Sequence, residues 1–311
     1  MGYASDKENL ESFFRENKVL KQRYKFFKLD LLDKKNLKDL IFNEKPNLVI
    51  HLAAESHVDK SIYNPSAFVL NNIVGTTNLL EALLDFWNSL EIDKKNNFRF
   101  LHVSTDEVFG SLNKVDRFSE NSAYLPNSPY SASKASSDHF VRAWFKTYNF
   151  PVIITNCSNN FGPWQFPEKL IPVILMNLIK KEKVPIYGNG ENIRDWIYVE
   201  DHVDALIKCA FNANIGKQYC IGGDNEISNY DMAKLICSIM DQKLPWNQPY
   251  ASLINFVDDR PGHDFRYSID SSKIKKDLNW SKKYNFEDAI SYTIDWYLKN
   301  QSWVLNKTIE N

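Results

Sequence analysis

Apolar runs alternate along the chain with amphipathic segments. The runs have the length and the branched, apolar character of buried strands, and they occupy residues 24–31, 47–53, 98–105, 151–159 and 218–223. The amphipathic segments predict helices over 34–45, 65–87, 128–148 and 201–212. Because strand and helix patterns alternate, the sequence predicts an α/β fold built on a doubly wound parallel sheet.

Several helix ends carry recognisable signals. Asp33 can cap the helix that follows it, and Pro46 ends that helix. Pro129 occupies the first position of another helix, where its missing N–H is not needed.

Residues 161–194 and 226–311 break the alternation. They hold turn signals such as PWNQP and DRPGH and two further helix patterns, at about 229–241 and 285–299. We therefore expect a sheet domain of residues 1–160 plus 195–225, and a smaller α/β lobe of residues 161–194 plus 226–311.

Composition narrows the class of protein. The 311 residues carry a formal charge of −1, so no basic field favours nucleic acid or anionic lipid. Apolar stretches look shorter than a membrane span, and the first residues lack the apolar core of a signal peptide. The four cysteines are scattered in apolar runs and predict buried thiols of a cytoplasmic protein, with neither a disulfide framework nor a metal site.

Candidate chemistry gathers where strands end. Asp106 and Glu107 directly follow the apolar run that ends near Thr105. Polar loops follow three strands, at 53–59, 104–110 and 156–163. Because ligands bind beyond the carboxyl ends of parallel strands, we expect these loops to converge on one pocket, and both acids to enter it through a bend of the chain.

Tyr130 and Lys134 form a Y-x-x-x-K pair at the start of a predicted helix. The spacing recurs elsewhere in the chain, but only this pair directly follows the acid-bearing loop. Residues four apart share a helix face, and a lysine cation near a phenol favours the phenolate base. The pair suggests oxidation of a hydroxyl group by a nicotinamide cofactor. Two further carboxyl groups fit a reaction that also removes water.

Motifs along the chain resemble a known enzyme family. HLAAESHVDKSI, VSTDEVFG, PYSASKASSDH, TNCSNNFGP and PIYGNGENIRDWIYVEDH look like the nucleotide-sugar 4,6-dehydratases of the extended short-chain dehydrogenase/reductase superfamily. The resemblance runs from about residue 3 to residue 303. It implies a Rossmann-like NAD-binding domain, NAD as cofactor and dTDP-glucose as substrate.

The resemblance also implies roles for individual residues. Tyr130 would take the proton of the sugar 4-hydroxyl, with Thr105 on that oxygen and Lys134 on the cofactor ribose. Glu107 would remove the C5 proton while Asp106 protonates the departing 6-hydroxyl. The implied cofactor contacts are Asp30, Leu31, Leu52, Ala53, Ala54, Ser56, Asn71, Tyr130, Lys134 and Asn160. The implied substrate contacts are Ser56, Thr105, Asn159, Lys169, Leu170, Pro185, Tyr187, Arg194, Asn229, Arg260 and His263.

One family feature has no counterpart in this chain. The family begins with a strand, a glycine-rich turn and a helix that hold the cofactor pyrophosphate, and this sequence has no such G-x-x-G-x-x-G motif. We expect a sheet that lacks its first βαβ unit and a chain that binds NAD weakly or not at all. Strand 24–31 would then either pair with 47–53 or leave an apolar edge exposed.

Two alternative functions remain. One is a nucleotide-sugar epimerase or decarboxylase on the same scaffold, against which Asp106 and Glu107 argue. The other is a non-catalytic fragment that binds nucleotide sugar. Thymidine and uridine nucleotides are not distinguished by the residues alone. The resemblance further implies a homodimer that forms through helices 65–87 and 129–148.

Overall fold

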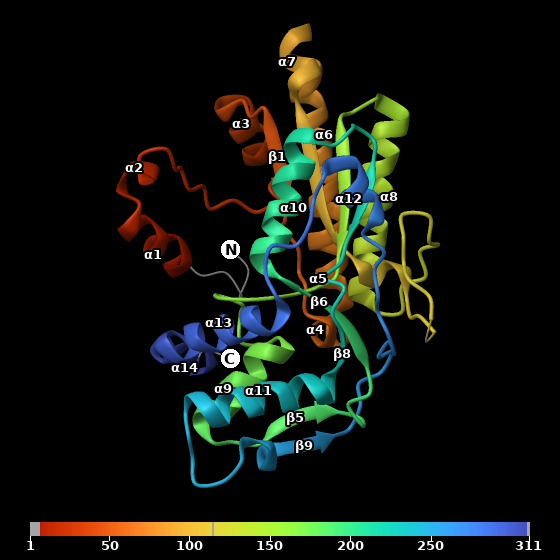
Figure 1. Ribbon diagram of the computed structural model, residues 1–311. Coiled ribbons are helices and arrows are strands. Elements are labelled where there is room, and N and C mark those ends of the chain that lie inside the picture. Colours follow the sequence, from red (N-terminus) through yellow and green to blue (C-terminus); the bar gives the residue numbers. More distant parts are fainter. Residues whose placement is uncertain (1–6, 114, 310–311) are drawn as a thin grey trace.

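A four-stranded parallel sheet forms the larger part of the molecule (Figure 1). The computed structural model describes residues 7–113 and 115–309. The sheet has the order β1-β2-β3-β7, formed by Leu48–His51, Arg99–Thr105, Val152–Cys157 and Gln218–Ile221. Leu101 pairs with Ile50 on one side and Ile153 on the other, so β2 lies inside the sheet. The predicted parallel α/β sheet is confirmed.

Helices cover both faces of this sheet. One face packs against α3 (Lys34–Glu44), α6 (Gly75–Asn88) and α8 (Pro129–Tyr148). The other packs against α10 (Val199–Asn212) and α12 (Ser272–Leu278). Neighbouring strand residues enter opposite cores, as Phe100 and Leu101 do, because side chains alternate along a strand.

Local signals explain several of these helices. Asp33 accepts a hydrogen bond from the N–H of Asn36 at 3.2 Å and so caps α3. Ser128 accepts one from the N–H of Ser131 at 3.1 Å, and Pro129 opens α8. The helix predicted over 65–87 is a continuous run of α5 (Pro65–Phe68), the π-helical turn η1 (Val69–Val74) and α6.

The smaller lobe lies below the sheet in Figure 1. It contains β5 (Val184–Tyr187) paired with β9 (Ile254–Val257), and a three-stranded sheet ordered β4-β6-β8, of Asn159–Phe161, Ile193–Tyr198 and Glu226–Ser228. Its core lies among α9 (Leu170–Lys180), α11 (Asn229–Lys243) and α13 (Phe286–Lys299). The two late helices predicted at about 229–241 and 285–299 are therefore present.

Shorter elements complete the described chain. They are α1 (Glu8–Glu16), α2 (Lys18–Lys21), α4 (Val58–Tyr63), α7 (Ile92–Asn97), the 3₁₀ turns η2 (Asp106–Phe109) and η3 (Tyr250–Leu253), and α14 (Gln301–Ile309). Figure 1 shows α1 and α2 standing apart from the sheet.

The strand predicted over 24–31 does not form. Residues 24–30 have no regular secondary structure, and Tyr24, Phe26 and Phe27 are 39–48% exposed. A strand needs a neighbour for its backbone groups, whereas this segment lies against α3, where Lys25 pairs with Glu44 at 2.7 Å.

In the described chain β1 pairs with β2 alone, so its other edge is open. Ile50 and Leu52 at that edge are 38% and 61% exposed. Of the two outcomes expected for this region, the exposed apolar edge is the one observed.

The helical run 65–88 is more apolar than we expected of any segment in this chain. The helical run 65–88 has a mean hydropathy of 1.2 over its most apolar window, enough by length and composition alone to cross a membrane. The expectation that every apolar stretch is too short is wrong for this helix. Half of that window is buried inside the protein, as in a core helix, because Leu80 and Leu83 pack against the sheet.

Candidate active site

The two acids lie in a bend at the carboxyl end of β2. The strand ends at Thr105, whose hydroxyl accepts a hydrogen bond from the N–H of Glu107 at 3.3 Å. The chain then turns through η2. This turn ends at Gly110, which has a φ of +87°. A Cβ there would lie 2.4 Å from the Leu125 carbonyl oxygen, so the turn requires glycine. The predicted bend is present, but it brings only Glu107 into the cavity wall, so the expectation that both acids enter the pocket is wrong for Asp106.

Helix α8 brings Tyr130 and Lys134 to the same place. Both side chains are buried, and Lys134 Nζ donates to the carbonyl oxygen of Val103 on β2 at 2.9 Å. Both Thr105 and Glu107 act on the pKa of the Tyr130 phenol, Thr105 lowering it and Glu107 raising it. The tyrosine, the lysine and the end of β2 therefore form one constellation.

A cavity of about 490 Å³ opens over this constellation, between the sheet and the smaller lobe. Thr105, Glu107, Tyr130 and Lys134 all line it. So do all the residues expected to contact the substrate, which are Ser56, Thr105, Asn159, Lys169, Leu170, Pro185, Tyr187, Arg194, Asn229, Arg260 and His263.

The expected cofactor contacts divide into two groups. Leu52, Ala54, Ser56, Tyr130, Lys134 and Asn160 line the cavity, whereas Asp30, Leu31, Ala53 and Asn71 do not. Asp30 is exposed, and the Leu31 side chain packs into the core under α3 and α6 instead. Asn71 donates to the carbonyl oxygen of Ala67 in its own helix. These four therefore do not line this cavity, and their contact with the cofactor stays a prediction.

Asp106 lies behind the cavity wall. It is 1% exposed, and burial, Glu107 and Asp195 raise its pKa well above the usual value. Burial also raises the pKa of Glu107, but the cations of Arg260 and Lys169 oppose that rise. The pKa is raised at both acids and further at Asp106, so Glu107 is the member of the pair that ionises more readily.

Tyr130 differs from expectation. Burial and the neighbouring Glu107 raise the pKa of the phenol well above its usual value. Lys134 is not among the groups that act on this phenol, since its Nζ donates to the Val103 carbonyl oxygen, so the role of Tyr130 as base stays a prediction.

Contacts between the two parts of the molecule bridge the cavity mouth. Lys169 Nζ donates to the Ser56 carbonyl oxygen at 2.6 Å. Arg260 Nη1 pairs with Asp59 Oδ1 at 3.1 Å, and the Tyr187 hydroxyl donates to Asp59 Oδ2 at 3.2 Å. The loop that follows β1 is therefore tied to the smaller lobe. We call these contacts the mouth bridges.

Several functional candidates were missed by sequence reasoning. The additional polar residues of the cavity wall are His57, Asp59, Ser104, Cys157, Ser158, Gln165 and Glu168. Asn72 holds the 53–56 loop by accepting from the N–H of Glu55 and donating to its carbonyl oxygen, and it also donates to Ser133. A polar residue inside an apolar helix pattern is the signal that could have found Asn72.

The cavity wall offers partners for a polar ligand but, among the described residues, no cradle for a pyrophosphate. Three oxygens at the junction of β3 and β4 are buried without a hydrogen-bond partner: Ser158 Oγ, Asn159 Oδ1 and Asn160 Oδ1. Buried polar atoms of this kind are normally satisfied, so they indicate a polar ligand. The described residues offer no glycine-rich turn for a pyrophosphate, in line with the sequence.

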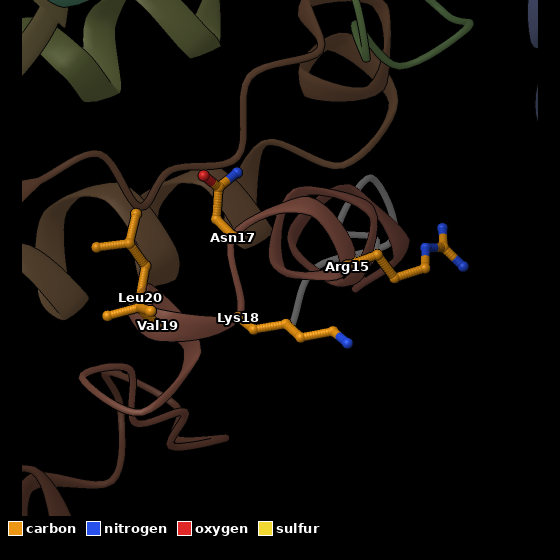
Figure 2. A pocket seen from close by; sticks show the side chains of 5 residues that line it. All are labelled: Arg15, Asn17, Lys18, Val19 and Leu20. Carbon is orange, nitrogen blue, oxygen red and sulfur yellow. The ribbon is translucent and has the colours of Figure 1, made fainter.

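A second hollow in the described structure is lined by no carboxyl, imidazole or thiol group. This hollow beside α1 and α2 is lined by Arg15, Asn17, Lys18, Val19 and Leu20, whose ends diverge in Figure 2. Within residues 7–113 and 115–309, no group of three His, Cys, Asp or Glu side chains could hold a metal ion.

Comparison with known proteins agrees with this geometry. The family model described as GDP-mannose 4,6 dehydratase matches residues 2–293. The dTDP-glucose 4,6-dehydratase 1 of Escherichia coli K12 is 48% identical over 98% of this chain and 85% of its own length. The dTDP-glucose 4,6-dehydratase of Neisseria meningitidis is 47% identical over 91% of this chain and 81% of its own.

Solved structures give the same result. The dTDP-glucose 4,6-dehydratase of Streptomyces venezuelae, solved with NAD, has a TM-score of 0.87 and 35% identity over 99% of this chain and 88% of its own. The UDP-glucose 4-epimerase of Thermotoga maritima, with a TM-score of 0.79 and 24% identity over 89% of this chain and 85% of its own, shares the fold alone. The chain belongs to the nucleotide-sugar 4,6-dehydratase family.

Proposed function

We propose that this protein is an NAD-dependent dehydratase that converts dTDP-glucose into dTDP-4-keto-6-deoxyglucose. The observation that carries the proposal is the meeting of Tyr130 and Thr105 with Glu107, backed by buried Asp106, at one cavity. Relatives named for this reaction, and neighbours solved with NAD, support the choice of substrate and cofactor.

The first stage is oxidation at C4 of the sugar. Tyr130 takes the proton of the 4-hydroxyl, and Thr105, which lines the cavity beside the phenol, orients that oxygen. Lys134, on the same helix face, holds a ribose hydroxyl of the cofactor. A bound NAD would supply the acceptor for the C4 hydride and the same hydride for C6.

The second stage is removal of water. The C4 ketone acidifies the C5 proton, which Glu107 removes as a carboxylate. Asp106 gives its proton to the 6-hydroxyl, which leaves as water, and Glu107 gives the proton back to C5 when the hydride reaches C6. The raised pKa of Asp106 supports the role of acid, and the cations around Glu107 support the role of base.

Glu107→Gln tests this division of labour. The amide cannot take the C5 proton, so oxidation should proceed while elimination fails, and reduced nicotinamide should accumulate in the absorbance spectrum. Glu182→Gln, at an exposed position, is the control and should turn over normally. Unimpaired turnover by Glu107→Gln would remove this residue from the mechanism.

A second function is favoured by one observation. All expected substrate contacts line the cavity, but four expected cofactor contacts do not. Such a chain could bind nucleotide sugar without catalysis. Calorimetry with dTDP-glucose, with and without NAD, separates the two functions. If the protein is a catalyst, NAD must bind. If it only binds nucleotide sugar, calorimetry should detect heat of binding for dTDP-glucose but not for NAD, and NAD should be lost on gel filtration.

We further propose a cytoplasmic homodimer, with the sheet domain and smaller lobe divided as the sequence suggested. The four free thiols support a reducing compartment. Exposed apolar side chains on the two expected interface helices support the dimer. They are Val69, Leu70, Val74, Phe140 and Tyr148. Sedimentation of the purified chain tests the dimer.

A further inference from the structure

A buried carboxylate stands one helical turn after Lys134. Asp138 is 1% exposed and faces the sheet from α8. It accepts hydrogen bonds from the Tyr124 hydroxyl at 2.8 Å and from Asn156 Nδ2 at 3.0 Å. His102 Nε2 on β2 lies 3.1 Å from its other oxygen. Burying a carboxylate this deeply costs free energy, which these partners must offset.

Asn156 connects this carboxylate to the reacting groups. Its Nδ2 also donates to the carbonyl oxygen of Thr105 at 3.0 Å. Its Oδ1 accepts from Gln218 Nε2 at 2.8 Å, and Gln218 Nε2 in turn reaches Tyr124 at 3.1 Å. The residue that ends β2 is therefore fixed, through one side chain, to Asp138 on the helix that carries Tyr130.

The same carboxylate acts electrostatically on Lys134. Four titratable groups interact electrostatically with Lys134: His51 on β1, His102 on β2, Cys157 on β3 and Asp138. Burial lowers the pKa of both histidines and raises the pKa of Cys157 to about 12, so these three are neutral.

Asp138 alone of these groups is ionised. Burial acts to raise its pKa, but the contacts with His102 and Lys134 outweigh burial and lower it. Burial lowers the pKa of Lys134, and Asp138 is the first group that opposes this fall.

We propose that Asp138 is a positioning residue of the active site, which keeps Lys134 charged and, through Asn156, holds Thr105 in register with Tyr130. The role of Lys134 toward cofactor rests on the proposed function. The effects of Asp138 on the charge of Lys134 and on the position of Thr105 do not depend on that function.

Asp138→Asn is the direct test, since it removes the charge and keeps the shape. The ε-carbon resonance of Lys134 in isotope-labelled protein, identified by its loss in Lys134→Arg, reports the titration of the ammonium. We expect the midpoint to fall by about one pKa unit in Asp138→Asn. Asp138→Glu, which keeps the charge, should restore most of it.

Matched controls separate charge from fold. Asp39→Asn removes an exposed carboxylate on α3 and should leave the Lys134 titration unchanged. Tyr124→Phe removes one hydrogen bond to Asp138 but no charge, and should shift the midpoint far less. If Asp138→Asn does not fold, Asp138→Ser leaves room for water between Tyr124 and Asn156 and gives the same comparison.

The outcomes are distinct from those of the proposed function. An unchanged Lys134 midpoint in a folded, charge-free variant at position 138 would overturn the inference, whether or not the protein is a dehydratase. Where turnover is measurable, the alkaline limb of the kcat profile should also move to lower pH, because Lys134 loses its proton earlier. The Michaelis constant for the sugar nucleotide should change less than kcat.

Discussion

His202 is buried near the start of α10, and in the described structure its Nε2 has no hydrogen-bond partner. Burial lowers its pKa to about 4 from the ordinary value of 6.5. The folded state therefore binds fewer protons than the unfolded state between those two values, and stability must rise with pH across that window.

Acid should therefore destabilise the protein through this residue. Its contribution is fully present above pH 6.5, is lost as pH falls toward 4, and amounts to about 3 kcal/mol. Urea denaturation at several pH values measures it. His202→Gln should flatten the profile, whereas His139→Gln, at an exposed position, should not. Equal profiles for wild type and His202→Gln would refute the assignment.

For single residues, the sequence predicted which side chains belong to the site better than it predicted what those side chains contact. Tyr130, Lys134 and the two acids were predictable because a motif and a strand end bring them together. The location of Asp106 behind the wall was not, because it depends on how far the chain turns between Thr105 and Gly110. Asp138 went unnoticed, since a lone acid in a helix pattern usually faces solvent.

Elements with local signals were predicted well. Helices α3 and α8 begin where Asp33 and Ser128 cap them, because a cap acts within one turn of chain. The segment 24–31 has a strand pattern but no local signal that supplies a partner. Its state depends on a distant edge, so the pattern alone could not decide it.

The cap of α8 gives a prediction at this scale. Ser128→Ala should lower the free energy of unfolding by about 1 kcal/mol, because the N–H of Ser131 loses its acceptor in a buried site. Chemical denaturation measures the loss. Ser136→Ala, within the same helix, is the control. It should be neutral or slightly stabilising because alanine favours a helix interior.

At the scale of the whole molecule, an apolar stripe runs beside the open sheet edge. Val203, Ile207 and Phe211 follow one another along one side of α10 and are 46–63% exposed. The side chains of Leu48 and Ile50 on β1 point to the face of the sheet that α10 covers, because residues two apart share a face. Leu48 packs against the core between α10 and the sheet. Exposed edges next to apolar surface favour self-association.

A single charge on that stripe should reduce self-association. Ile207→Lys is expected to lower light scattering on concentration or mild heating, with little change in the denaturation midpoint, since the side chain is half exposed. Asn214→Lys adds the same charge at an exposed position off the stripe and should have less effect. Equal scattering by both variants would show that the stripe does not drive association.

The mouth bridges imply an unusual response to ionic strength. An anionic ligand that enters the cavity meets Arg260 already neutralised by Asp59, and must displace that carboxylate before it can be held. Salt normally slows the capture of an anion by a basic site, because it screens the attraction. Here screening also weakens the pair that closes the entrance, so moderate salt is expected to speed the arrival of a sugar nucleotide.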